Sequence, residues 1–237
     1  IIVSQNNPPV IEDVPNTTVV LQINELMDSI DFTISEQDGD TLTTTFNNVP
    51  TGLTASIDED GKSNGLISGT PTVSGLFALN ISSTDSAGGQ TQQNLSIYVN
   101  NPPQITSTAI TTVRANTNYV YDVTATDTDT DDIVTLTATT IPDWLSFTNS
   151  QLSGTSPDSV DSLYDVTIKA EDSNGGTAIQ IFVVTVSSNV APSISIIENT
   201  ILQVGDTVSI SSTVTDEDNT SITTTASLED GTSLPTW

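Results

Sequence analysis

The chain is 237 residues long, carries 30 acidic side chains against 3 basic ones, and contains no histidine or cysteine. Without those two residue types the sequence excludes Ser-His and Cys-His nucleophiles, the usual zinc, haem and iron–sulfur sites, and disulfide bonds. A formal net charge of −27 also leaves too few lysines and arginines for nucleic-acid binding, so cations or basic surfaces are the expected partners.

The start of the chain shows no targeting segment. Ile1–Ser4 does not form the basic n-region of a signal peptide, and no apolar run approaches the roughly 18 residues that a membrane helix needs. We therefore expect no membrane span in this segment, and we expect any export signal to lie outside it.

Five short segments recur in the same order along the chain, which indicates a tandem array. Pro9, Pro103 and Pro192 mark the starts of the repeats and lie 94 and 89 residues apart. The recurring segments are a proline-containing start (7–9, 101–103, 190–192), an acidic loop (36–40, 127–131, 216–219), a Pro segment (49–53, 141–145, 234–237), a Ser-Gly-Thr segment (66–70, 151–155) and a Gly-Gly turn (85–89, 172–176). They predict the end of a preceding repeat at 1–6, a first domain at 7–100, a second at 101–189 and the first half of a third at 190–237. We therefore expect the chain to be a piece of a longer array.

Between these segments apolar and polar residues alternate with period two. The pattern is clear at Ile30–Ile34 and Phe77–Ser83 in the first repeat, and at Tyr119–Ala125 and Tyr164–Ala170 in the second. No window sustains a helical period, and Gly-Gly, Asp-Gly and Asn-Gly pairs supply turns. The sequence thus predicts an all-β protein of immunoglobulin-like antiparallel β-sandwiches, with about seven strands per repeat, joined end to end.

The second repeat carries a recognisable set of motifs. They are Ile141–Phe147 (Ile-Pro-Asp-Trp-Leu-Ser-Phe), Leu152–Thr155 (Leu-Ser-Gly-Thr) and Ala170–Gly176 (Ala-Glu-Asp-Ser-Asn-Gly-Gly). In this order, and with the acidic loop before them, they resemble dystroglycan-type cadherin-like domains and the closely similar immunoglobulin-like repeats of microbial cell-surface proteins. The first repeat departs from the pattern with Gly52 at the position of Trp144. The resemblance covers nearly the whole chain and implies fold much more specifically than function.

The acidic loops are the candidate functional sites of the chain. In such a sandwich the loop after the second strand and the turn before the last strand lie at one pole, beside the preceding linker. Carboxylates and amide oxygens converging there suit Ca²⁺, which takes about six to eight oxygen ligands. The candidate ligands are Glu36, Asp38, Asp40 and Asp85 with linker residues Asn6 and Asn7, then Asp127, Asp129, Asp131 and Asp172 with Asn100 and Asn101, and finally Asp216 and Asp218.

The linkers and acidic loops differ from those of known Ca²⁺-binding modules. The resemblance implies Ca²⁺ at the junctions, as in cadherins, but the linkers lack the aspartates of cadherin linkers and no Asp-Arg-Glu motif is present. An EF-hand is excluded, because Asn47 and Ala138 stand where its bidentate Glu is due. The remaining alternative is that the loops are solvated turns, which favour Asp and Asn. Asp58–Gly61 has no counterpart in the second repeat and is predicted to be a hairpin tip.

Other features have ordinary structural explanations. Trp144 and Trp237 follow prolines in a repeated segment, which favours core packing over sugar stacking. Runs such as Thr43–Thr45 and Thr135–Thr139 are explained by β-propensity rather than by ice binding. Four Asn-x-Ser/Thr sequons are candidate glycosylation sites in an exported protein, at Asn16, Asn80, Asn94 and Asn219.

These observations predict a structural or adhesive stalk segment of a large extracellular surface protein, with Ca²⁺ opposing the self-repulsion of acidic domains. Its partners would be neighbouring repeats of the same chain, and other surface proteins or glycans. One alternative is a building block of a surface layer or extracellular filament with lateral contacts between sandwich faces. Another is an accessory module of a secreted carbohydrate-active enzyme, which would need an exposed aromatic strip. Catalysis is not expected, because the acidic groups recur once per repeat instead of forming one cleft.

Overall fold

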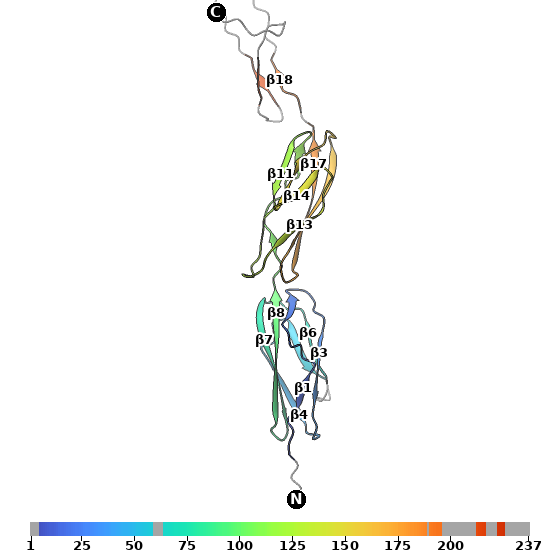
Figure 1. The fold of residues 1–237 in the computed structure, drawn as a ribbon, viewed down its shortest axis with the longest axis vertical. Helices are drawn as coiled ribbons and strands as arrows, with labels where there is room; N and C mark the ends of the chain where they lie inside the picture. Colours follow the sequence, from blue (N-terminus) through green and yellow to red (C-terminus); the bar gives the residue numbers. More distant parts are fainter. Residues whose placement is uncertain (1–4, 59–63, 189, 196–211, 217–221, 226–237) are drawn as a thin grey trace, which may run out of the picture.

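A computed structural model describes residues 5–58, 64–188, 190–195, 212–216 and 222–225. In these residues the secondary structure is entirely β, and the strands form two sandwiches that follow one another along the long axis of the molecule (Figure 1). After the two sandwiches a further pair of strands follows, β18 (Ser193–Ile194) and β19 (Val214–Thr215), which belongs to the third repeat. A search of the described residues for a helix of membrane-spanning length and apolar character finds none.

The first sandwich consists of two four-stranded sheets. One sheet has the order β1 (Val10–Glu12), β3 (Ile30–Ser35), β6 (Asn64–Gly69), β5 (Leu53–Ile57). The other has the order β2 (Val19–Gln22), β8 (Gln90–Asn100), β7 (Gly75–Asp85), β4 (Leu42–Asn47). All pairs are antiparallel except β2 with β8, because the chain crosses from one sheet to the other between β1 and β2.

The second sandwich repeats this topology. Its larger sheet has the order β10 (Thr112–Arg114), β17 (Thr177–Ser187), β16 (Ser162–Glu171), β13 (Thr135–Thr140), and β10 again runs parallel to β17. The facing strands are β11 (Asn118–Asp122), β15 (Gln151–Thr155) and β14 (Leu145–Thr148), with β9 (Gln104–Ile105) pairing β12 (Ala125–Thr126). The prediction of tandem immunoglobulin-like sandwiches is confirmed.

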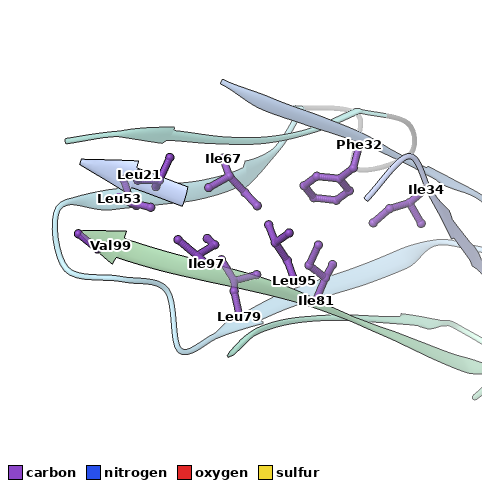
Figure 2. Packing of buried hydrophobic residues seen from close by; sticks show 10 residues of the cluster. All are labelled: Leu21, Phe32, Ile34, Leu53, Ile67, Leu79, Ile81, Leu95, Ile97 and Val99. Carbon is purple, nitrogen blue, oxygen red and sulfur yellow. The ribbon is translucent and has the colours of Figure 1, made fainter. Parts of the chain in front are cut away.

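Alternation along the long strands builds the cores. In the first domain Leu79 and Ile81 of β7 meet Leu95 and Ile97 of β8 and Ile67 of the opposite sheet, and all five are fully buried (Figure 2). Burying such side chains stabilises the fold by roughly 1.5–3 kcal/mol each. The polar residues between them point outward, as the period of two requires.

The second core contains the aromatic residues. The Trp144 ring packs edge-on against Tyr119 at a centroid distance of 5.9 Å and against Tyr164 at 5.5 Å. Tyr119 is buried, and its hydroxyl donates to the Ile110 carbonyl oxygen over 2.8 Å. Burial, with a smaller contribution from Tyr121, raises the pKa of Tyr119 to about 12. Trp144 therefore packs into the core, as its place in the repeat predicts.

Several expectations fall on residues outside this description. Residues 1–4, most of the third repeat including Asp218, Asn219 and Trp237, and residues 59–63 of the predicted hairpin tip are outside the described ranges. Among the other sequons, Asn16 is exposed before β2, and Asn80 and Asn94 face each other across β7 and β8, joined by a 2.9 Å hydrogen bond.

Candidate cation site at the domain junction

Asn100 ends strand β8 and is the buried centre of the junction. It belongs to the last strand of the first domain, yet its side chain is completely inaccessible to solvent. Its Nδ2 donates to Gln22 Oε1 of the first domain and to Asp172 Oδ2 of the second, each over 2.9 Å. The amide group thus joins the two domains and has a fixed orientation.

The turn between β16 and β17 holds Asp172 in place for this contact. Asp172 Oδ1 accepts hydrogen bonds from the backbone N–H groups of Asn174 and Gly176, each 2.8 Å long. A Cβ on Gly176 would lie 2.3 Å from Asp172 Oδ2 and 2.7 Å from Asn100 Nδ2. Glycine is therefore required in the second position of the Gly-Gly turn because the linker approaches the turn backbone too closely for a side chain.

The acidic loop after β12 completes the pole of the second domain. Carboxylate oxygens of Asp127, Asp129 and Asp132 all lie within 4.8 Å of one another. Asp129 also accepts from Asn101, whose backbone N and Nδ2 lie 2.7 Å and 3.0 Å from its two oxygens. The loop, the linker and the Gly-Gly turn therefore meet at one pole, as predicted.

The expectation that Asp131 joins this cluster is not met. The Asp132 N–H donates to the Asp129 carbonyl oxygen over 3.2 Å, and the tight turn that this bond closes leaves Asp131 exposed. Asp132 takes its place, and its Oδ1 accepts from Ser173 Oγ over 2.8 Å and from Asn174 Nδ2. The third carboxylate of the cluster is therefore that of Asp132, one residue after the predicted Asp131.

Three oxygens at this pole are buried without a donor. Asn100 Oδ1, Asp127 Oδ2 and Asp132 Oδ2 have no hydrogen-bond partner in the described part of the chain. Leaving a buried polar atom unpartnered costs roughly 1–3 kcal/mol, and more for a charged group, so each such atom needs an explanation. Ligand oxygens around one Ca²⁺ lie about 2.3–2.6 Å from the ion, and the carboxylate oxygens of Asp127, Asp129 and Asp132, within 4.8 Å of one another, are close enough to share one ion.

The first domain builds the same arrangement at its own pole. Carboxylate oxygens of Glu36, Asp38 and Asp40 again lie within 4.8 Å of one another. Asn7 N donates to Asp38 Oδ2 over 2.6 Å, in the manner of Asn101. Asn6 Oδ1 and Glu36 Oε1 are buried without a partner in the described residues.

Asp85 of the first domain corresponds to Asp172. It accepts from Asn6 Nδ2 over 3.0 Å and from the backbone N–H groups of Ala87 and Gly89 over 3.0 Å and 2.8 Å. Burial alone would raise the pKa of Asp85, but these hydrogen bonds to the carboxylate outweigh it and hold the pKa below its ordinary value. Asp85 is therefore a charged anchor for the linker, as the Gly-Gly turn motif suggests.

Two residues of the first domain reach the pole of the second, and sequence reasoning missed both. Tyr98 lies in β8, and burial, a hydrogen bond to Asp129 and the charges of the acidic cluster raise its pKa to about 12. Gln22 Nε2 donates to the Asn174 carbonyl oxygen over 3.0 Å. Gln22 ends β2 and Tyr98 lies two residues before the end of β8, and no sequence motif marks either residue, so only the structure shows their contact with the second domain.

The third repeat is described only in part. Asp216 directly follows β19, as Asp127 directly follows β12. Asp218 lies outside the described residues, so the third predicted pole stays a prediction.

Comparison with known proteins gives a family match over most of the chain. The family model described as "Putative Ig domain" matches residues 3–100 and again residues 102–187. No curated protein matches.

Similar solved structures have low sequence identity. An I-band fragment of titin, I67–I69, is 14% identical with a TM-score of 0.49, covering 79% of this chain and 68% of that one. The protocadherin GammaB4 extracellular domain is 12% identical with a TM-score of 0.38, covering 83% and 36%. The endo-fucoidan hydrolase MfFcnA4 of glycoside hydrolase family 107 is 19% identical with a TM-score of 0.34, covering 77% and 29%.

Proposed function

The chain belongs to the Putative Ig domain family, with two tandem copies of the domain, and from that premise we propose that it is a stalk segment of an extracellular surface protein, stiffened by Ca²⁺ at its junctions. Tandem immunoglobulin-like domains constitute a structural or adhesive module.

The observation that carries the proposal is the set of buried oxygens without donors. Asn100 Oδ1 is held in a fully buried amide whose nitrogen is already engaged on both sides. Asp127 and Asp132 each present a further buried oxygen without a partner among the described residues. A cation among the carboxylates of Asp127, Asp129 and Asp132 would satisfy two of these residues, and Asn100 Oδ1 supplies a further oxygen at the same pole.

The ligand chemistry favours Ca²⁺ over other cations. The candidate ligands are oxygens only, because the sequence has neither histidine nor cysteine. Zinc and most transition metals prefer nitrogen and sulfur ligands, and Mg²⁺ requires near-ideal octahedral geometry with several waters. A mixture of carboxylate and amide oxygens on loops suits the larger and more tolerant Ca²⁺. Extracellular modules bind Ca²⁺ in roughly the 10⁻⁴–10⁻³ M range, so an extracellular segment of this kind would be loaded at millimolar Ca²⁺.

A bound cation would reduce the repulsion between the two acidic domains and so limit bending at the junction. The chain carries a formal charge of −27, and the acidic clusters lie at the poles where one domain meets the next. Uncompensated carboxylates facing a neighbouring acidic domain favour separation, and a bound divalent cation reverses that preference. Because Asn100 and Tyr98 belong to the first domain and the carboxylates to the second, an ion held by these groups restrains bending between them.

Calorimetric titration of the 237-residue chain with CaCl₂ tests the proposal. We expect saturable binding with at least two sites, one at each described pole, and clearly weaker binding of MgCl₂. Small-angle X-ray scattering in the same samples should show a narrower distribution of end-to-end lengths with Ca²⁺ than with chelator. Absence of binding at millimolar Ca²⁺, or an identical length distribution in both conditions, would overturn the proposal.

A further inference from the structure

The outer face of the larger sheet in the second domain carries an unpartnered apolar strip. Strand β17 directs Ile179, Ile181 and Val183 outward, and Leu163 of β16 lies opposite Thr185 on the same face. Their exposed fractions are 61%, 74%, 39% and 70%. These four residues are called the β17 strip below.

The sandwich itself does not require these side chains. The inward positions of β17 that build the core are occupied by Phe182, Val184 and Val186. In the first domain, strand β8 has the same length, and its residues at the positions of Ile179, Ile181 and Val183 are Gln92, Asn94 and Ser96. The position of Leu163 is occupied by Leu76, which is also exposed. At the three β17 positions one copy of the fold is therefore stable with polar residues where the other exposes apolar ones, which indicates a role in contact with a partner.

The charges around the strip indicate the kind of partner. On the outward face of this sheet Asp165 and Glu171 are balanced by Lys169 and Arg114. The face thus has no net charge, although the whole chain carries −27 and its acidic clusters lie at the poles. A strongly basic partner would be attracted to the poles, whereas this face fits a neutral apolar surface.

We propose that the β17 strip is a self-association surface that docks on the same strip of a second copy of the chain. A two-fold contact places apolar residues against apolar residues, and the balanced charges around the strip cause no net repulsion. The contact is lateral and therefore leaves the poles free for end-to-end neighbours. It goes beyond the stalk proposal and does not depend on cation binding.

Sedimentation equilibrium of the full chain at about 0.15 M salt, which screens the general repulsion between acidic copies, tests the proposal. The wild-type chain should show a concentration-dependent monomer–dimer equilibrium, with Ca²⁺ and with chelator alike. The variant Ile179→Gln/Ile181→Asn/Val183→Ser installs the residues of the first domain and should weaken association at least tenfold while keeping the melting temperature. Leu26→Gln, at a residue with 81% exposure elsewhere on the surface, is the matched control and should associate as the wild type does. A wild-type chain that stays monomeric up to high concentration, or a triple variant that associates equally well, would overturn the proposal.

A cysteine cross-link gives a second and independent readout. The chain has no cysteine, so Thr167→Cys, opposite Ile181 in the sheet, introduces a single thiol beside the strip. Asn80→Cys introduces one at the corresponding position of the first domain. We expect Thr167→Cys to form disulfide-linked dimers under mild oxidation much faster than Asn80→Cys. Equal rates for the two variants would contradict docking through the β17 strip.

Discussion

Asn100 is the last residue of the first domain's final strand, yet its side chain is buried against Asp172 of the second domain, with Nδ2 2.9 Å from Asp172 Oδ2. The linker between the domains therefore begins inside the hydrogen-bond network of the second domain. Bending at this point would break a buried contact to a carboxylate, which is among the stronger hydrogen bonds in proteins. The junction thus has an intrinsic preference for one arrangement, which a cation would reinforce.

Gly176→Ala should undock the linker. The new Cβ would lie 2.3 Å from Asp172 Oδ2 and 2.9 Å from Pro102 Cα, so either the turn or the linker must move. Overpacking of this kind typically costs about 1–3 kcal/mol. Separate rotational correlation times of the two domains, from ¹⁵N relaxation, should diverge in the variant. Thr177→Ala, at the adjacent exposed residue, is the control, and equal behaviour of the two variants would contradict the role given to the linker contact.

Tyr98→Phe should loosen the junction while leaving the cores intact. The variant removes a hydroxyl that hydrogen-bonds Asp129 across the junction. Such a bond to a charged group contributes about 1.5–3 kcal/mol. Interdomain order measured by ¹⁵N relaxation should fall, and in a double-mutant cycle Tyr98→Phe should add little once Asp129→Asn is present, whereas Asp129→Asn also affects the contacts with Asn101. Fully additive losses would show that the two residues act independently.

Asp85→Asn should change how the free energy of unfolding of the first domain depends on pH in the acidic range. Because the folded pKa of Asp85 is lower than its ordinary value, the carboxylate contributes stability above the ordinary value near 3.8, and this contribution is lost as the pH falls through the folded pKa. The variant should be less stable than the wild type at pH 7 and should approach it at low pH. Urea unfolding followed by circular dichroism from pH 7 to pH 2 measures this convergence. Asp31→Asn, at an exposed residue of β3, is the control, and a constant gap at all pH values would contradict the prediction.

Trp144→Ala should strongly destabilise the second domain. The indole packs edge-on against Tyr119 and Tyr164, and removing a large core aromatic costs about 3–5 kcal/mol. Trp144→Phe should cost clearly less, because the buried Nε1 has no hydrogen-bond partner in the described residues. Urea unfolding measures both variants, with Asp143→Ala as the neighbouring exposed control. A loss below about 1 kcal/mol for Trp144→Ala would contradict a core role.

The sandwiches were predictable from the sequence because each long strand alternates. At Ile30–Ile34 and Tyr164–Ala170 only one phase is strongly apolar, so the inward face follows directly. Strand β17 is different, since Ile179 and Ile181 are as apolar as the buried Phe182 and Val184. Periodicity cannot distinguish the two faces there, and the exposed strip became visible only in the structure.

Only part of the candidate site could be predicted from the sequence. One error arose from the local geometry of a turn, and one omission arose from the docking of the two domains. Recurring loops were enough to predict that Asp172 and Asn100 lie at one pole. The choice between Asp131 and Asp132 depends on one hydrogen bond that closes the turn at Asp129, and adjacent aspartates give no pattern from which to predict it. Tyr98 enters the site from the preceding domain, and that placement depends on how the two domains dock.

A comparison of Asp132→Asn with Asp131→Asn tests the central claim most directly. The two variants remove one negative charge from neighbouring residues, but only Asp132 belongs to the carboxylate cluster, whereas Asp131 is exposed. Thermal unfolding of the full chain is followed with Ca²⁺, with Mg²⁺ and with chelator. Ca²⁺ at about 100 times its dissociation constant should stabilise the wild type by about 2.7 kcal/mol.

The account predicts that Asp131→Asn keeps the Ca²⁺-dependent rise in melting temperature and that Asp132→Asn loses most of the part assigned to the second domain. Mg²⁺ should raise the melting temperature less than Ca²⁺ in the wild type. A wild-type chain that melts identically with Ca²⁺ and with chelator, or a Ca²⁺ effect that depends on Asp131 and not on Asp132, would contradict the claim that a cation joins the two domains.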